Sequence, residues 1–168
     1  MKVAICTEDT YGPGFLRGLI SKMRREGYIS KDLKVVKIAL IKKCHNVRNK
    51  VLAVIREVDR VLILIDKENE YEYDEREHIW RHLKGLKESD RSKVVVVATE
   101  PCIEEWICKS LGLNFDRTGL NVEQKPDRVL RRRYGYKKRR LPKYVNKLDI
   151  DGLLRNSKSF KEFCAALR

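Results

Sequence analysis

The chain has 168 residues, enough for one domain with an appendage and too few for two large domains. Lysine and arginine outnumber aspartate and glutamate by 38 to 24, and the resulting formal charge of +14 predicts a polyanionic partner, either nucleic acid or an anionic membrane surface. The sequence has no run of roughly 20 apolar residues that could cross a membrane, and the start of the chain turns acidic at Glu8, so we expect a cytoplasmic protein without a membrane partner.

The apolar pattern predicts strands that alternate with amphipathic helices. In chain order these are a strand at 3–6, a helix at 15–27, a strand at 33–41, a helix at 47–55, a strand at 61–65, a helix at 79–87, a strand at 94–97 and a helix at 103–111. Because the strand runs are apolar at nearly every position, they predict a parallel sheet covered by helices on both faces. We therefore expect an α/β fold with a doubly wound, mainly parallel four-stranded sheet. Ser159 followed by Glu162 matches a capping box and predicts one more short helix near the end of the chain.

The composition changes at about residue 113, so we expect an α/β domain over residues 1–112 and a basic extension with docking helices over residues 113–168. Residues 125–144 carry ten lysines or arginines against one aspartate, with tyrosines interleaved. Lysine and arginine neutralise phosphates, and tyrosine stacks on the bases of single strands or RNA loops, so this basic arm predicts contact with RNA or DNA. The candidate contacts are Arg131, Arg132, Arg133, Tyr134, Tyr136, Lys137, Lys138, Arg139 and Arg140.

The same cations have a second interpretation, the solvated surface of a thermophilic protein. The chain contains a single glutamine, Gln124, which also favours a thermophilic origin. Ten cations against one anion nevertheless exceed what surface ion-pair networks use, so nucleic acid is the favoured partner. Anionic lipid is disfavoured because no apolar helix face accompanies the charges.

Acidic residues gather where the predicted strands end, which is where ligands bind in open parallel sheets. Asp66 and Glu68 are two residues apart, so they point to the same side if the strand geometry continues. Carboxylates within ~4 Å of one another repel by roughly 4 kcal/mol at an effective dielectric constant of 20, so a cation is expected among them. The candidates are Lys67, Lys42 and Lys43, or a Mg²⁺ or Mn²⁺ ion with oxygen ligands. The residues at the three strand ends are Glu8, Asp9, Asp66, Glu68, Thr99 and Glu100.

Four segments resemble the Toprim domain of topoisomerases, primases and nucleases. The first two are VAICTE, with a glutamate directly after the first strand, and VLILIDKE, with an acidic pair after a later strand. Two more, TEPCIEEW at 99–106 and NSKSFKEF at 156–163, are similar to segments of small stand-alone Toprim-like proteins. Glu68 stands where the family usually has aspartate. The resemblance covers most of the chain.

This resemblance implies a nucleic-acid-binding protein that cleaves phosphodiester bonds with Mg²⁺ or Mn²⁺, most simply a nuclease. It implies Glu8 as general acid or base and Asp66 and Glu68 as metal ligands, with Glu104 and Glu105 as possible additional ligands. The alternative interpretation of Glu104 and Glu105 is that they interact with the dipole of the helix they begin.

Two weaker patterns also have a functional interpretation. In DTYGPGF, Gly12 and Gly14 flank Pro13 at the start of a helix and predict backbone amides that contact a phosphate, with an ordinary tight turn as the alternative. His78 and His82 are one helical turn apart, a spacing that can hold zinc, although the surrounding residues are typical of a charged surface helix.

Two other functions stay open. A non-catalytic RNA- or DNA-binding module with the same fold would keep its activity when Asp66 becomes asparagine. A phosphorelay receiver domain has acids after the first strand, a phosphorylated aspartate after the third and a hydroxyl after the fourth, an outline that Glu8, Asp9, Asp66 and Thr99 match. The predicted elements lack the fifth strand and the lysine that such a domain carries.

Overall fold

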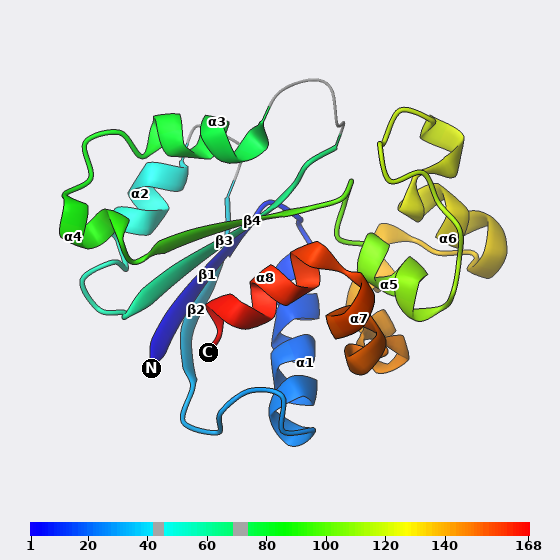
Figure 1. Ribbon diagram of the computed structural model, residues 1–168, viewed down its shortest axis with the longest axis horizontal. Coiled ribbons are helices and arrows are strands. Elements are labelled where there is room, and N and C mark those ends of the chain that lie inside the picture. The colour runs from blue at the N-terminus through cyan, green and yellow to red at the C-terminus, as the bar shows by residue number, and fades with distance from the viewer. Residues whose placement is uncertain (42–45, 69–73) are drawn as a thin grey trace.

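The four strands form one parallel sheet in the order β2-β1-β3-β4, in a computed structural model that describes residues 1–41, 46–68 and 74–168 (Figure 1). The strands are β1 (Lys2–Thr7), β2 (Lys34–Leu40), β3 (Arg60–Asp66) and β4 (Val94–Thr99). Each neighbouring pair is parallel, so the expected α/β fold with a parallel four-stranded sheet is confirmed. The strand order reverses direction between β1 and β3, and open sheets of this kind bind ligands at that switch point.

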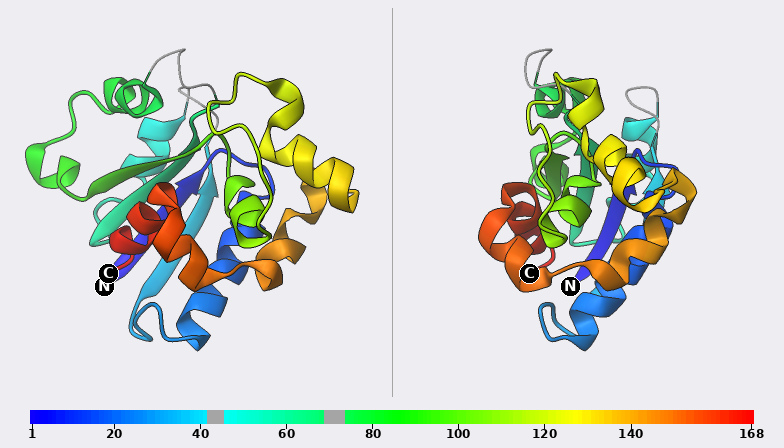
Figure 2. Two further views of the ribbon diagram at one scale, coloured as in Figure 1. Left: turned by 45° about the vertical axis from the view of Figure 1, so that its right-hand side comes forward. Right: turned by 90° about the vertical axis from the view of Figure 1, so that its right-hand side faces the viewer.

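Helices cover both faces of the sheet (Figure 2). One face carries α2, α3 and α4, and the other carries α1 and α8, with α5, α6 and α7 beside them. The helices are α1 (Gly12–Arg25), α2 (Val47–Leu52), α3 (Glu75–His82), α4 (Glu88–Arg91), α5 (Glu105–Ser110), α6 (Pro126–Tyr134), α7 (Ile150–Asn156) and α8 (Lys158–Ala166), with two 3₁₀ segments, η1 (Val122–Gln124) and η2 (Lys138–Lys147). The sequence patterns gave positions for α1, α2, α3, α5 and α8, whereas α4 was not predicted and the docking helices expected in residues 113–168 had no ranges that would match α6 or α7.

Alternation along β3 explains why its sequence is apolar throughout. Leu62 and Leu64 pack into the cluster on the α1 side, whereas Ile63 and Ile65 pack into the cluster on the α2 side. Successive side chains of a strand point to opposite faces, so a strand with two covered faces has no polar side.

The basic extension lies on the body of the protein along its length rather than projecting from it. Leu130, Leu141 and Val145 belong to the same buried cluster as β1 and α1. Segment η2 runs against α1, where a Cβ atom at Gly18 would lie 3.2 Å from a methyl carbon of Val145. The apolar residues spaced among the cations therefore pack into a core that this segment shares with β1 and α1.

The final helix is present, but its predicted N-cap is wrong. Ser157, not Ser159, caps α8 by accepting a hydrogen bond from the Phe160 amide at 3.3 Å. Ser159 is buried instead, and its hydroxyl lies between Glu105 and Trp106, accepting from the indole Nε1 of Trp106 at 2.8 Å and donating to Glu105. The two segments that resemble Toprim-like proteins, 99–106 and 156–163, thus contact each other in the core.

Candidate functional site

The carboxyl ends of β1 and β3 bring Glu8 and Asp66 together. The Asp66 amide donates to Glu8 Oε1 at 2.5 Å. Asp66 Oδ1 accepts from the Thr99 hydroxyl at 2.7 Å and from the Ile103 amide at 3.0 Å. Strand β3 lies between β1 and β4, and all three run parallel. Asp66 therefore meets Glu8, which is 58 positions away in the sequence, and Thr99, which is 33 positions away, at one edge of the sheet.

Two adjoining hollows open at this edge. The first has a volume of about 380 Å³ and is lined by residues that include Glu8, Asp9, Asp66, Glu68 and Lys138. The second, of about 270 Å³, shares Asp66, Glu68 and Lys138 with the first and adds Glu104. We call the first the acid hollow. Glu8, Asp66 and Glu68 therefore line one hollow.

Glu68 reaches the acid hollow by a route that its sequence spacing did not predict. Strand β3 ends at Asp66, and Glu68 has φ of 63°, in the left-handed region that non-glycine residues rarely adopt. The Glu68 amide donates to the Pro101 carbonyl at 2.8 Å, and Gly119 packs so closely that a Cβ there would lie 1.9 Å from the Glu68 carbonyl oxygen. These contacts hold the strained backbone in place.

A lysine from the basic extension lies among the acids. Lys138 Nζ is 2.6 Å from Asp9 Oδ2 and 2.8 Å from Glu104 Oε1, and Glu104 Oε1 also accepts from the Tyr136 hydroxyl at 2.9 Å. Burial opposes the charge of Lys138, but the carboxylates of Glu104 and Asp9 more than compensate and raise the pKa of its ammonium. The predicted counter-cation Lys67 lines a different hollow, and Lys42 and Lys43 fall outside the described residues.

Glu104 and Glu105 are both fully buried, but only Glu104 faces the acids. Glu105 Oε1 accepts from the Glu100 amide at 2.9 Å, and Glu105 Oε2 lies 2.5 Å from Lys109 Nζ. With Ser159 also bound, Glu105 is engaged within the core. The possible ligand role of Glu105 is therefore corrected to a structural one, whereas Glu104 Oε2 is buried without a hydrogen-bond partner among the described residues.

The buried acids change the ionisation of Asp66. Burial, followed by the charges of Glu104 and Glu8, raises the pKa of Asp66 well above its usual value, although Lys138 and the Thr99 hydroxyl act in the opposite direction. The charged form of Asp66 is thus costly until a cation approaches it, and a bound divalent ion would reverse that preference.

The raised pKa predicts that Asp66→Asn stabilises the metal-free protein at neutral pH. A folded-state pKa above the unfolded value contributes stability at low pH that is lost as pH rises through the folded pKa, at about 1.4 kcal/mol per unit of elevation. Asparagine keeps the Oδ1 acceptor for Thr99 and Ile103 without the charge. Urea unfolding in EDTA between pH 3 and pH 8 should show equal stabilities near pH 3 and a growing advantage of the variant towards pH 8. A constant difference across that range would contradict the assignment.

The donors at the site suit a hard divalent ion. Mg²⁺ is usually held by one or two protein carboxylates with water and substrate phosphates, and Asp66 with Glu8 or Glu68 matches that requirement. In the described part of the chain, no three or more His, Cys, Asp or Glu side chains form a group that could hold a metal ion by themselves. His78 and His82, whose spacing could have suited zinc, are not part of such a group among the described residues. Their rings pack edge to face, with centroids 4.8 Å apart.

The glycine turn before α1 serves packing at Gly12. The Gly12 amide donates to the Asp9 carbonyl at 3.0 Å, so the prediction that it contacts a phosphate is wrong. A Cβ at Gly12 would lie 2.8 Å from the Thr7 hydroxyl oxygen, which leaves no space for a side chain. Gly14 is exposed but lies against Pro142 of η2, where a Cβ would be 3.1 Å from the proline ring.

Most of the predicted nucleic-acid contacts are exposed. Those with exposed side chains are Arg131, Arg132, Arg133, Tyr134, Lys137, Lys138, Arg139 and Arg140. Tyr136 is only 4% exposed and packs edge to face on the buried Tyr144, so its predicted stacking on a base is wrong. A third hollow of about 580 Å³, lined by Arg128, Arg131 and Lys137 among others, adjoins the acid hollow because Lys138 lines both.

Within the described residues, no helix combines the length and the apolar character needed to cross a membrane. Comparisons with family models, with curated proteins and with solved structures found no match to this chain. The arrangement of the side chains is therefore the basis for assigning a function.

Proposed function

We propose that the protein binds nucleic acid and hydrolyses its phosphodiester bonds with the help of Mg²⁺ or Mn²⁺, as the resemblance to the Toprim domain implies. The observation that carries the proposal is the acid hollow, in which Glu8 and Asp66 meet at the switch point of the sheet while Lys138 connects them to an exposed basic surface. A basic surface attracts phosphates, and the carboxylates provide oxygen ligands for a divalent ion.

The residues have separate roles in this proposal. Asp66 and Glu68 would hold the ion, and Glu8 would accept a proton from the attacking water. A bound Mg²⁺ would neutralise the charge that develops on the phosphoryl oxygens, which is the main requirement of this chemistry. Lys138, held by Asp9 and Glu104, places one more positive charge at the wall of the acid hollow. Exposed cations on α6 and in residues 137–140 hold the rest of the nucleic acid.

The direct test uses labelled single- and double-stranded RNA and DNA, each incubated with Mg²⁺, Mn²⁺ or EDTA. Cleavage of at least one substrate that depends on the metal supports the proposal. Absence of cleavage with all four substrates, under conditions in which binding is detected, would exclude it. The four substrates also establish whether RNA or DNA is the target.

Binding should depend steeply on salt and on Tyr134, a residue that is 47% exposed on the basic surface. Contact with about six phosphates predicts a slope of log affinity against log salt of about −4 for a single strand. Tyr134→Ala should weaken single-strand binding by about 1 to 3 kcal/mol, because base stacking on the ring is lost. Fluorescence anisotropy between 50 and 300 mM salt measures both. Tyr28→Ala is the matched control, and equal losses in the two variants would argue against stacking.

The second candidate is a nucleic-acid-binding module without catalysis. Lys138 favours it, because its ammonium already neutralises Asp9 and Glu104 without a metal ion. In that case binding persists in EDTA, no substrate is cleaved, and Asp66→Asn binds as tightly as the wild type.

A receiver-like phosphoacceptor is the third candidate, favoured because Lys138 supplies the cation that the predicted elements lacked. Asp66 Oδ1 is already bound to Thr99 and Ile103, which opposes attack by this carboxylate. Incubation with acetyl phosphate and Mg²⁺ decides the matter by mass spectrometry. If the mass of the protein does not increase by 80 Da, the mass of one phosphoryl group, this candidate is excluded.

A further inference from the structure

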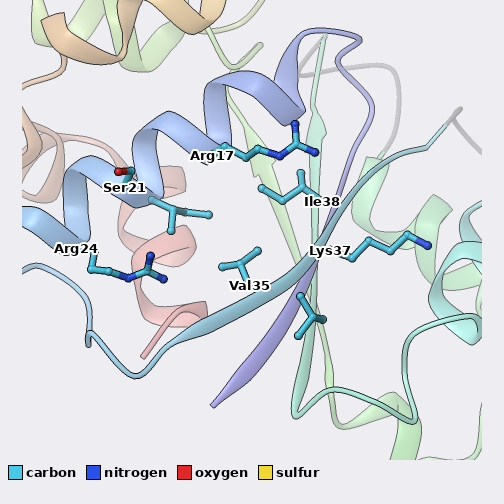
Figure 3. A pocket seen from close by; sticks show the side chains of 8 residues that line it. Arg17, Ser21, Arg24, Val35, Lys37 and Ile38 are labelled. Atoms are coloured by element: carbon cyan, nitrogen blue, oxygen red, sulfur yellow. The ribbon is translucent and has the colours of Figure 1, made fainter.

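A separate groove lies between α1 and β2, away from the residues given a role above (Figure 3). Its volume is about 410 Å³. The residues that line it are Arg17, Ile20, Ser21 and Arg24 on α1 and Val35, Val36, Lys37 and Ile38 on β2. None of these lining residues, all within the described part of the chain, carries a carboxylate.

The helix side of this α1–β2 groove carries side chains that can bind an anion. Residues 17, 21 and 24 are three and four positions apart and share one face of α1. Arg17 and Arg24 extend from α1 towards β2, with Ser21 between them, whereas the ammonium of Lys37 extends away from α1 (Figure 3). Arg24 donates to the Leu33 carbonyl at 2.7 Å, which fixes its guanidinium in position.

The strand side provides an apolar floor at an exposed edge of the sheet. Val35 and Ile38 are partly buried on the α1 side, and Val36 is 48% exposed. The register passes from Val3 opposite Val35 to Ala4 opposite Lys37, so Val36 is the extra residue of a β-bulge. A bulge and edge lysines hinder the addition of another strand, so a β-strand from a partner protein or a second copy of this strongly basic chain fits poorly here.

The groove and the acid hollow lie along the same two elements, α1 and β2, at different positions. Tyr11, at the start of α1, and Leu40, at the end of β2, line the acid hollow, whereas Arg17 and Ile38 line the groove. A strand that extends from the acid hollow along α1 and β2 therefore reaches the groove. Residues 125–144, by contrast, reach the acid hollow through Lys138.

We propose that the α1–β2 groove binds the backbone of a single nucleic-acid strand that leaves the acid hollow, with Arg17 and Arg24 on its phosphates. The apolar floor suits the sugar and base faces, which only an unpaired strand exposes. The inference rests on the proposed function in that the strand is the substrate. It adds a substrate class, single strands long enough to extend past the acid hollow.

The test compares two double variants that each lower the net charge by two. Arg17→Gln/Ser21→Glu changes the groove at two exposed positions, and Arg25→Gln/Lys31→Gln changes exposed positions nearby that do not line it. Binding of fluorescein-labelled single strands of 20 and 6 nucleotides is measured in EDTA, so that cleavage plays no part. Circular dichroism of both variants verifies the fold.

The groove variant should bind the 20-nucleotide strand about tenfold more weakly, and its slope of log affinity against log salt should be smaller in magnitude by about 1. The affinity of the control variant should decrease by less than about a factor of two. Binding of the 6-nucleotide strand should change equally in both variants. In the wild type, hydrogen exchange in α1 and β2 should slow when the 20-nucleotide strand is added.

Equal losses of affinity for the 20-nucleotide strand in the two double variants, or no slowing of hydrogen exchange in α1 and β2, would overturn the groove inference. The proposed function would still stand as long as the wild type binds the strand. Failure of the wild type to bind any strand would overturn both. A polyglutamate peptide is the remaining probe. If the groove variant loses affinity for that peptide and keeps its affinity for the 20-nucleotide strand, the groove binds an acidic protein segment and the inference is wrong.

Discussion

Asp66→Asn is expected to reduce metal-dependent cleavage at least about a hundredfold, because it removes a negatively charged ligand of the ion that stabilises the transition state. Asparagine keeps the Oδ1 acceptor for the Thr99 hydroxyl and the Ile103 amide, so the local fold should persist. Activity is measured as initial rates on the best substrate across a series of Mg²⁺ concentrations. A lower affinity for the metal would appear as a partial recovery of the rate at high Mg²⁺.

Glu8→Gln should lower the rate by about 10² to 10⁴, the usual contribution of a general base. Glutamine can still accept the hydrogen bond from the Asp66 amide through Oε1. Unlike the Asp66 variant, this one should not recover at high Mg²⁺. Asp32→Asn, at an exposed position between α1 and β2, is the control for the loss of one carboxylate and should retain wild-type activity. Wild-type rates in both the Glu8 and Asp66 variants would exclude the acid hollow as the catalytic site.

Trp106→Ala is expected to be the most destabilising of the core substitutions, by about 3 to 5 kcal/mol. Trp106 is fully buried, and its ring centroid lies 5.1 Å from that of Phe160 and 5.3 Å from that of Phe163. Alanine would leave a large cavity between α5 and α8 and remove the indole donor from the buried Ser159 hydroxyl. For a chain of this length the loss corresponds to a decrease in Tm of about 6 to 20 °C.

Differential scanning calorimetry of Trp106→Ala, Trp106→Phe and Trp80→Ala measures this effect. Trp106→Phe fills most of the cavity and should recover about half of the loss. Trp80, the second tryptophan of the chain, is only partly buried on the other face of the sheet, where Arg91 lies over its ring at 5.1 Å. If Trp80→Ala and Trp106→Ala cost the same, the contact between segments 99–106 and 156–163 is not the main link between α8 and the core.

The sheet and its acidic edge could be predicted because both depend on local patterns. Apolar runs such as 61–65 require cover on both faces, and cover on both faces implies parallel strands joined by helices. Parallel strands place their carboxyl ends at one edge, so Glu8 and Asp66 were expected near each other from their positions after strands. Their meeting through the Asp66 amide follows from β1 and β3 being neighbours.

The surroundings of the acids could not be predicted in the same way. Lys138 is one of ten cations in residues 125–144, and the local sequence does not distinguish it from Lys137. Its place between Asp9 and Glu104 depends on η2 packing against α1. The position of Tyr136 within a basic run predicts that it stacks on a nucleic-acid base, but the same packing buries it.

The α/β class, the four strands and the acidic residues at their ends follow from local patterns in the chain, since periodicity and strand direction are properties of short segments. The folded structure was needed to establish that Lys138 neutralises Asp9 and Glu104, that Glu105 belongs to the core, and that Arg17 and Arg24 share a groove with β2. These contacts join residues that are distant in the sequence, so they depend on how whole elements pack.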